Sequence, residues 1–339
     1  MSNFRFLTAG ESHGKALTAI IEGLPSGFEI SPDFINEELK RRQQGYGRSS
    51  RQQLEADIVE ITAGIKNGKT TGAPVCLVIY NKDFSEKPAF TKYRPGHADF
   101  AGSEKYNLDD LRDVLERASA RKTAIEVAVG AIAKQILKEF DICCSSKILQ
   151  IGNATENFEE EIDKAKENGD SLGGKFEVVF KNLPVGLGSH VHWDRNLDGK
   201  IAQAVMSIGG VKVVEIGENP LGKMGSEYHD ELFVENGKIY RKTNNAGGIE
   251  GGMTNGEDLV VRAVMKPIPT MVKPLNTVDK ASFEQCEAHF ERSDTCAVES
   301  CSVVAENRIA CVLLDEFLNK FGGDSLKEIE DRLWQKKGF

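Results

Sequence analysis

The sequence predicts a mixed fold, either α+β or a layered α/β arrangement, with long buried helices. Short apolar runs bounded by glycine or proline are typical of strands. Residues 119–140 carry alanine and branched side chains nearly all round their first half, which indicates a helix buried on more than one side. Strands and helices do not alternate regularly, and no GxGxxG follows the first strand, so a doubly wound nucleotide-binding fold is not predicted.

Each element is predicted from local pattern. Ser31, Pro32 and Asp33 supply a cap, a first-turn proline and an acid near the positive helix end, so a helix should run from there to about Arg42. Further helices are expected at 119–140, 196–207, 302–319 and 324–337, and strands at 4–8, 18–22, 74–80, 176–180 and 258–265. Acidic residues 154–172 should form a surface helix and loop. No internal repeat is found, and residues 1–339 are treated as a single domain.

Composition excludes several classes of protein. The 339 residues include 43 Lys and Arg against 52 Asp and Glu, a formal charge of −9, which argues against broad nucleic-acid binding. No apolar run approaches the roughly 20 residues that cross a bilayer, and the start resembles no signal peptide. Seven cysteines without CxxC spacing favour reduced thiols. We therefore expect a cytoplasmic protein without membrane attachment.

A cluster of cations stands out in this acidic chain. The stretch KRRQQGYGRSSR, residues 40–51, holds Arg42, Arg48 and Arg51 around a glycine-rich turn. A local basic cluster in an acidic protein favours a small anionic ligand held in a focused field.

Two loops contain histidines beside charged groups. In TAGESHG, residues 8–14, His13 follows the first predicted strand, and in KYRPGHADF, residues 92–100, His97 lies between Arg94 and Asp99. Imidazole titrates near neutrality, so both could transfer protons beside an anionic substrate. Each segment also has a structural interpretation: His13 could be a solvated loop histidine, and the His97 segment could be a capped turn with an ordinary ion pair.

Three further segments are candidates. In ERSDTCAVES, Arg292 could clamp a phosphate and Asp294 could act as a base, although a surface ion pair fits equally. The glycine-rich loop at 244–256, followed by KPIPT at 266–270, permits close approach of backbone to a flat or phosphorylated ligand. His190 and His192 could face one side of a strand, but no third ligand accompanies them, so no metal site is predicted.

Six ordered segments resemble the signatures of the chorismate synthase family: TAGESHG, RRQQGYGRSSR, RPGHAD, ERASARKTA, TNNAGGIEGGMTNGEDLVVRAVMKPIPT and ERSDTCAV. They span nearly the whole chain. The likeness is to the shorter bacterial type, which has LERASAR and RSD where others have GGGRSSAR and RHD. The resemblance implies a β-α-β sandwich core and a homotetramer. It also implies a lyase that ends the shikimate pathway in aromatic amino acid biosynthesis.

The implied reaction is an anti-1,4-elimination of phosphate from 5-enolpyruvylshikimate 3-phosphate, giving chorismate. It needs reduced FMN without net redox change. Either NADPH or an external flavin reductase would supply the reduced flavin, and the absence of obvious large insertions favours the external source.

The resemblance also assigns residues. His13 and His97 match two histidines, one of which protonates the reduced flavin while the other assists the departing phosphate; the sequence does not say which does which. Asp294 matches the aspartate that helps to remove the C6 proton. Arg42 and Arg48 match basic residues for NADP or anion binding, and Arg51 and Arg94 are further anion candidates. Flavin contacts map onto Arg117, Ala118, Ser119, Gly209, Gly210, Gly251, Lys266, Pro267, Ile268, Pro269, Thr270 and Arg292. A helix beginning near Arg117 should point its positive end at an anion.

Some residues depart from the family pattern. Lys122 replaces a common glutamate, SIGG at 207–210 replaces SINA or SIQA, and residues 297–300 lack a usual proline. We expect these changes to alter affinity at most. Two other functions fit some of the motifs: a catalytically silent flavin- or nucleotide-binding module, and a hydrolase of phosphate esters that uses a histidine.

Overall fold

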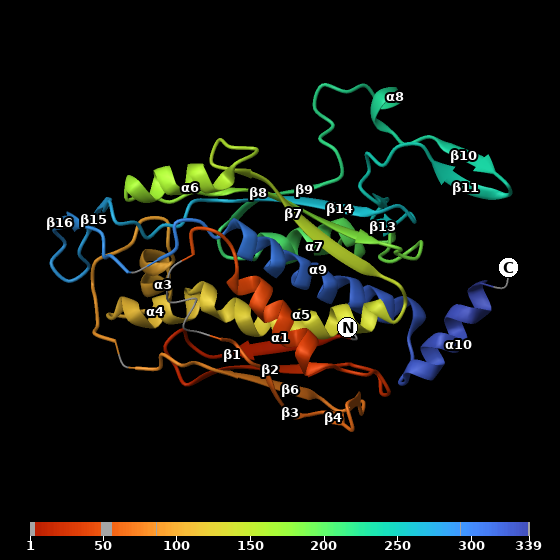
Figure 1. Ribbon diagram of the computed structural model, residues 1–339, viewed down its shortest axis with the longest axis horizontal. Helices are drawn as coiled ribbons and strands as arrows, with labels where there is room; N and C mark the ends of the chain where they lie inside the picture. Colours follow the sequence, from red (N-terminus) through yellow and green to blue (C-terminus); the bar gives the residue numbers. More distant parts are fainter. Residues whose placement is uncertain (1–3, 49–55, 86, 292, 338–339) are drawn as a thin grey trace.

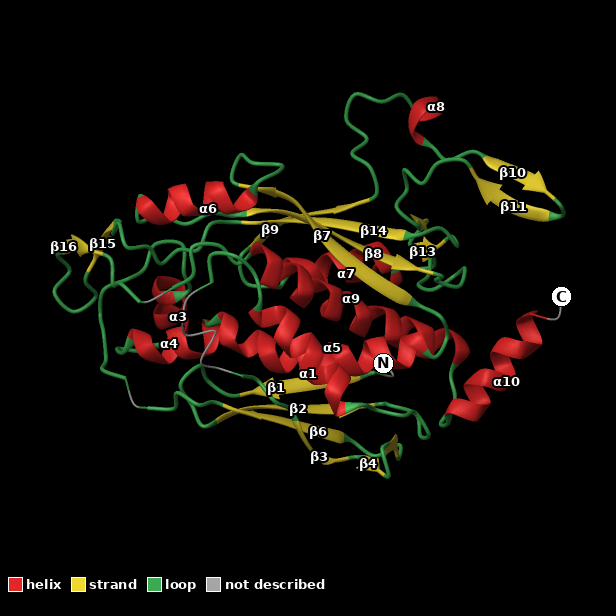
Figure 2. Cartoon of the chain, viewed as in Figure 1, coloured by secondary structure: helices red, strands yellow, loops and turns green. Residues whose placement is uncertain are grey.

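The core consists of two antiparallel sheets with a layer of helices between them (Figures 1 and 2). The computed structural model describes residues 4–48, 56–85, 87–291 and 293–337. One sheet has the order β1-β2-β6-β3 and comprises Arg5–Ala9, Ala16–Glu22, Val75–Tyr80 and Glu60–Ala63. The other has the order β7-β8-β14-β9 and comprises Cys143–Ile151, Gly174–Lys181, Leu259–Met265 and Val211–Ile216. The predicted α+β class is confirmed.

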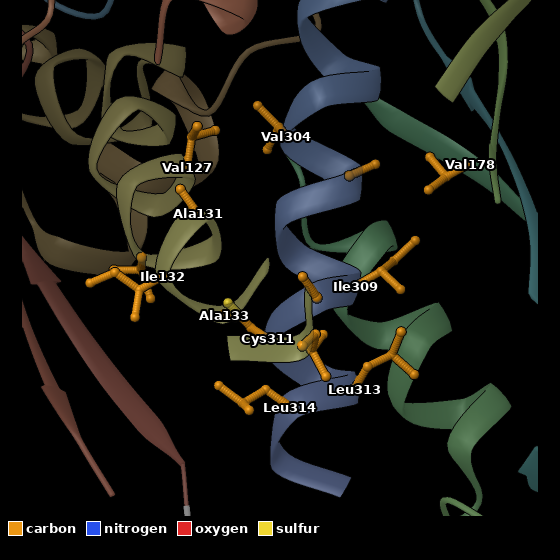
Figure 3. Close-up of a cluster of buried hydrophobic side chains, with 14 of the residues drawn as sticks. Val127, Ala131, Ile132, Ala133, Val178, Val304, Ile309, Cys311, Leu313 and Leu314 are labelled. Carbon is orange, nitrogen blue, oxygen red and sulfur yellow. The ribbon is translucent and has the colours of Figure 1, made fainter. Parts of the chain in front are cut away.

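The helical layer contains α1 (Pro32–Gln43), α5 (Thr123–Lys138), α7 (Leu197–Met206) and α9 (Val298–Phe321). Figure 3 shows small and branched side chains of α5 and α9 meeting between the sheets. The two helices approach closely at Gly130, where a Cβ atom would lie 2.4 Å from Asn307 Cβ. A glycine is therefore required at this crossing, because any side chain would force the helices apart.

A network of buried charges crosses the helical layer. Lys134 Nζ of α5 lies 2.6 Å from Glu38 Oε2 of α1 and 2.5 Å from Glu306 Oε2 of α9. Arg41, from the basic cluster, lies 2.8 Å from Glu306 Oε1. Because these charges satisfy one another, the network fixes how three helices pack, and Arg41 contributes to the core and not to an anion site.

Smaller elements surround this core. They are β4 (Ile65–Lys66), β5 (Lys69–Thr70), α3 (Asp99–Tyr106), α4 (Leu111–Ala118), η1 (Ala120–Lys122), α6 (Phe158–Glu167), η2 (Trp193–Arg195), α8 (Gly225–Tyr228), β10 (Leu232–Glu235), β11 (Lys238–Arg241), β12 (Ile249–Glu250), β13 (Met253–Thr254), β15 (Asn276–Val278), β16 (Gln285–Glu287) and α10 (Leu326–Lys337). In Figure 1, α8, β10 and β11 form an arm that projects from the body. In the described part of the chain, no helix combines the length and apolarity needed to cross a bilayer.

Most predicted elements are present, and Ser31 caps α1 by accepting a hydrogen bond from Phe34 N. The predicted helix at 119–140 starts with a 3₁₀ turn: Ser119 Oγ accepts a hydrogen bond from Arg121 N and caps η1, which leads directly into α5 at Thr123. The expectation that a helix begins near Arg117 is wrong. Arg117 lies in the last turn of a separate helix, α4, which is capped by Asp110 and packs in a small apolar cluster with Phe90.

The segment containing His190 and His192 is also not the strand that was expected. It forms bends that lead into η2, and His192 Nδ1 lies 2.7 Å from Asp194 Oδ1 on the surface. Residues 190–192 pair with none of the described strands. The two histidines therefore do not share one face of a sheet, as a strand would have required.

Candidate active site

One cleft of about 410 Å³ gathers most of the predicted site residues. Its walls come from the loop after β1, the loop before α3, the α4–η1–α5 junction, the segment after β14 and the approach to α9. Predicted residues that line it are His13, Arg42, Arg48, Arg94, His97, Ala118, Ser119, Gly209, Gly210, Lys266, Pro267, Ile268, Pro269, Thr270 and Asp294. Segments from both ends of the chain therefore meet here.

His13 is held by a carboxylate from α4. Its Nδ1 lies 2.8 Å from Glu116 Oε1, and its backbone N–H donates to Glu116 Oε2 at 2.7 Å. Burial raises the pKa of Glu116, but the hydrogen bonds from His13 and Ser12 outweigh this and bring it to about 2. Glu116 is therefore ionised near neutral pH, and its negative charge faces the ring of His13.

His97 has an equivalent carboxylate partner in Asp99, at the start of α3. The distance from His97 Nδ1 to Asp99 Oδ1 is 2.8 Å, and Arg94 Nε and Nη2 donate to the same carboxylate at 2.8 and 2.7 Å. Burial raises the pKa of Asp99, yet the Arg94 and His97 hydrogen bonds more than offset this and hold it well below its usual range. Arg94 is thus partly occupied in orienting Asp99 and His97.

Asp294 is paired with the basic cluster. Arg48 Nη1 lies 2.8 Å from Asp294 Oδ2, and both side chains are largely buried. The turn before Arg48 makes this contact possible: Thr295 N donates to Gly47 O at 2.9 Å, and a Cβ at Gly47 would lie 2.7 Å from Ile162 Cγ2. Gly47 also has a φ of 82°, in the left-handed region that favours glycine.

Arg42 has a different role from Arg48. Its Nε donates to Thr123 Oγ1 at 2.9 Å, and Nη1 lies 3.5 Å from Asp57 Oδ2. Asp57 also binds Arg121 Nη1 at 2.6 Å, so this buried carboxylate joins two arginines beneath the α4–α5 junction. Burial lowers the pKa of Arg42 to about 10. We interpret Arg42 as a support for the cleft floor.

The segment after β14 closes another wall of the cleft. Lys266 Nζ donates to Gly96 O, which links this segment to the loop carrying His97, and burial together with the nearby Lys212 lowers the pKa of Lys266. Ser171 Oγ donates to Ile268 O at 2.6 Å. At Gly209 an added Cβ would meet no atom within 4 Å, so the cleft is open there.

Two of the predicted flavin contacts do not reach this cleft. The Arg117 guanidinium donates to Gly10 O at 2.9 Å and to Thr8 Oγ1 at 2.9 Å, so it fixes the loop after β1. Gly251 lies in the turn between β12 and β13, and neither it nor Arg117 lines the cleft in the described part of the chain. Arg51 and Arg292 lie outside the described residues.

Sequence reasoning overlooked Glu116, Asp57 and Arg121, all of which support the cleft. Glu116 and Arg121 belong to the ERASARKTA segment, where only Arg117 to Ser119 had been singled out. The signal that could have found them is the presence of charged side chains at a junction between apolar helices. Lys122, which departs from the family pattern, lines the cleft.

The geometry defines an enzyme of a particular class: two carboxylate-held histidines, an aspartate and several cations face one cleft suited to proton transfer on an anionic substrate. The chorismate synthase family profile matches residues 4–318. A chorismate synthase from Thermoanaerobacter pseudethanolicus is 53% identical over 96% of both chains, and one from Alkaliphilus oremlandii is 47% identical, also over 96% of both.

A solved structure agrees with these matches. A crystal structure of chorismate synthase is 40% identical, with a TM-score of 0.81, over 98% of this chain and 97% of the other. The chain belongs to the chorismate synthase family. It is an enzyme of this type, a lyase that eliminates phosphate from 5-enolpyruvylshikimate 3-phosphate to give chorismate in the last step of the shikimate pathway. The family needs a reduced flavin.

Proposed function

We propose that substrate and reduced FMN bind together in this cleft and that the elimination takes place there. The supporting observation is that three proton-transfer candidates and several cations line one space of about 410 Å³: His13, His97, Asp294, Arg48, Arg94, Arg121, Lys122 and Lys266. Neither rival function needs all three proton-transfer groups. A binding module without activity needs no acid or base, and a phosphate-ester hydrolase that uses one histidine needs neither the other groups nor a flavin-binding site.

The cations match the charge of the substrate, which carries a phosphate and two carboxylates. Arg48 Nε is buried and has no hydrogen-bond partner among the described residues, so it can still donate a hydrogen bond to an anionic oxygen. Guanidinium groups bind such oxygens in bidentate geometry and keep their charge. The lowered pKa of Lys266 reflects burial and the charge of Lys212, and an incoming anion would offset both effects.

The cleft also fits a flavin. Its volume lies in the usual range of about 300–1,000 Å³ for ligand sites. The open space at Gly209 leaves room for a planar ring, and residues 266–270 offer backbone groups beside it. Ser119 and the start of α5 would face the flavin phosphate. Reduced FMN supplies electron density that eases departure of the substrate phosphate.

The chain's own residues would handle the protons. In this proposal Asp294, held by Arg48, takes part in removing the proton from carbon. One histidine delivers a proton toward the leaving phosphate, and the other controls protonation of the flavin. Arg48 and Lys266 stabilise the released phosphate, and the enclosing loops exclude water.

An anaerobic assay tests this proposal. With chemically reduced FMN, the purified chain should convert the substrate into chorismate and phosphate, and oxidised FMN should support no turnover. Release of phosphate without chorismate in the absence of flavin would identify a hydrolase. Flavin binding without turnover under either condition would identify a binding module.

Three properties are proposed from family membership. The chain should be a homotetramer, which sedimentation analysis would test, and exposed apolar residues on the arm, such as Leu232 and Val234, are compatible with subunit contacts. It should reside in the cytoplasm, which cell fractionation would test. An oxygen-free assay with NADPH as the only reductant would distinguish intrinsic flavin reduction from an external flavin reductase.

A further inference from the structure

Glu116 makes an unusually complete set of contacts with the loop that carries His13. Its Oε2 accepts hydrogen bonds from Ser12 Oγ and His13 N, at 2.5 and 2.7 Å, and its Oε1 lies 2.8 Å from His13 Nδ1. Ser12 N also donates to the Glu116 backbone carbonyl at 3.1 Å. The carboxylate is only 12% exposed, so water competes little for these contacts.

This pattern determines which nitrogen of His13 carries a proton. An ionised carboxylate can only accept, so Nδ1 must be the donor to Glu116. The Ser12 hydroxyl, 3.1 Å from Nδ1, cannot donate to Nδ1, because its own proton is already given to Glu116 Oε2. Both neighbours of Nδ1 are therefore acceptors, and Nδ1 carries hydrogen in the neutral ring.

The other ring nitrogen then faces the cleft. His13 lines the cleft, and Nε2 makes no hydrogen bond to any described residue. The carboxylate oxygen Asp83 Oδ2 lies 3.9 Å from His13 Nε2, which is beyond hydrogen-bond distance. Nε2 is consequently the atom that can give or take a proton.

His97 is not constrained in the same way. Its Nδ1 lies 2.8 Å from an acceptor, Asp99 Oδ1, and 2.8 Å from a donor, Arg94 Nη2. These neighbours favour opposite tautomers, whereas all the neighbours of His13 Nδ1 favour one. The two histidines therefore differ in how firmly the protein sets their tautomer.

We infer that Glu116 is the positioning residue for His13, holding its ring with Nδ1–H directed to the carboxylate so that only Nε2 exchanges a proton in the cleft. This inference rests on the proposed function, in which His13 takes part in the chemistry. Glu116 itself touches neither substrate nor flavin in this assignment. It acts through orientation and tautomer, as the carboxylate partners of catalytic histidines do.

A double-mutant cycle tests the inference in the full enzyme with reduced FMN. Glu116→Gln should lower kcat about 10- to 100-fold with little change in KM, and it should have no further effect in a His13→Ala background. Equal loss in both backgrounds would show that Glu116 does not act through His13. Glu177→Gln is the matched control: it neutralises another buried carboxylate, paired with Arg262 away from the cleft, and should leave kcat unchanged.

Nitrogen NMR of the His13 ring provides a readout independent of turnover. The wild-type enzyme should show the neutral ring protonated at Nδ1, and Glu116→Gln should shift the population toward Nε2–H. A wild-type ring protonated at Nε2, or a tautomer unchanged by Glu116→Gln, would overturn the inference. If His13→Ala had normal turnover, the proposed role of His13 would fail, and the NMR result would still decide the role of Glu116.

Discussion

Arg48 and Asp294 form a buried ion pair with 2.8 Å between Nη1 and Oδ2, although they come from loops near opposite ends of the chain. The sequence suggested separate roles for them, one as a substrate anchor and the other as a base. Their contact means that the cation orients the aspartate as well as attracting anions. A change at either residue should therefore affect both binding and chemistry.

Replacing Arg48 tests this dual role. Arg48→Ala should raise KM, because an anion contact is lost, and should also lower kcat by about 10-fold or more, because the Arg48 contact that orients Asp294 is removed. Steady-state kinetics with reduced FMN measure both effects. A change in KM alone would show that Arg48 does not position Asp294. Lys40→Ala, at an exposed position of the same cluster, is the control and should leave both constants unchanged.

His97 should be essential to turnover. His97→Ala should lower kcat by about 10²-fold or more, the usual scale for losing a general acid or base. His192→Ala provides a matched control, because His192 is also bonded through Nδ1 to a carboxylate, Asp194, but lies exposed at η2. Equal activity of the His97 variant and wild type would remove His97 from the proposed mechanism.

Gly130 should allow α5 and α9 to pack closely. Gly130→Ala places a Cβ 2.4 Å from Asn307 Cβ, so the helices must separate, and the free energy of unfolding should fall by about 1–3 kcal/mol. Gly199→Ala in α7 is the control, since its nearest neighbour, Trp193 O, lies 4.0 Å from the new atom and alanine favours a helix. Urea unfolding of the Gly130→Ala and Gly199→Ala variants measures both free energies. Equal destabilisation by the two substitutions would contradict the steric explanation.

The buried network should make stability depend on pH. Burial raises the pKa of Glu306, but the Arg41 hydrogen bond and the Lys134 charge outweigh this and bring it to about 2. A folded pKa below the unfolded value of about 4.5 means that this stabilisation is complete above pH 4.5 and is lost as the pH falls through 2. Urea unfolding between pH 7 and pH 3 should follow this trend.

A variant separates this network from other acids. Glu306→Gln should lower the free energy of unfolding at pH 7 by about 3–5 kcal/mol and reduce its acid dependence, because Lys134 loses a partner. Adding Lys134→Met should recover part of the loss, since it removes the cation that Glu306→Gln leaves underpaired. A double variant less stable than Glu306→Gln would contradict this account.

Local pattern predicted most elements but misplaced one boundary that shapes the site. The capping sequence at Ser31 defines the start of α1 because the hydrogen bond to Phe34 N is local. The local pattern did not indicate α4, whose Leu111 and Leu115 pack with Phe90 from an earlier segment, whereas the cap at Ser119 is local because its Oγ accepts from Arg121 N. The start of α5 at Thr123 placed Arg121 and Lys122 on the cleft wall.

The sequence by itself determined the residue types of the cleft, because cations, histidines and glycines in ordered motifs restrict which chemistry is available. Only the tertiary structure decided how the cations are divided. Arg41 enters the helical network, Arg42 supports the α4–α5 junction and Arg48 reaches Asp294. The physical reason is that a buried charge needs a partner, and each partner comes from a segment that only folding brings near.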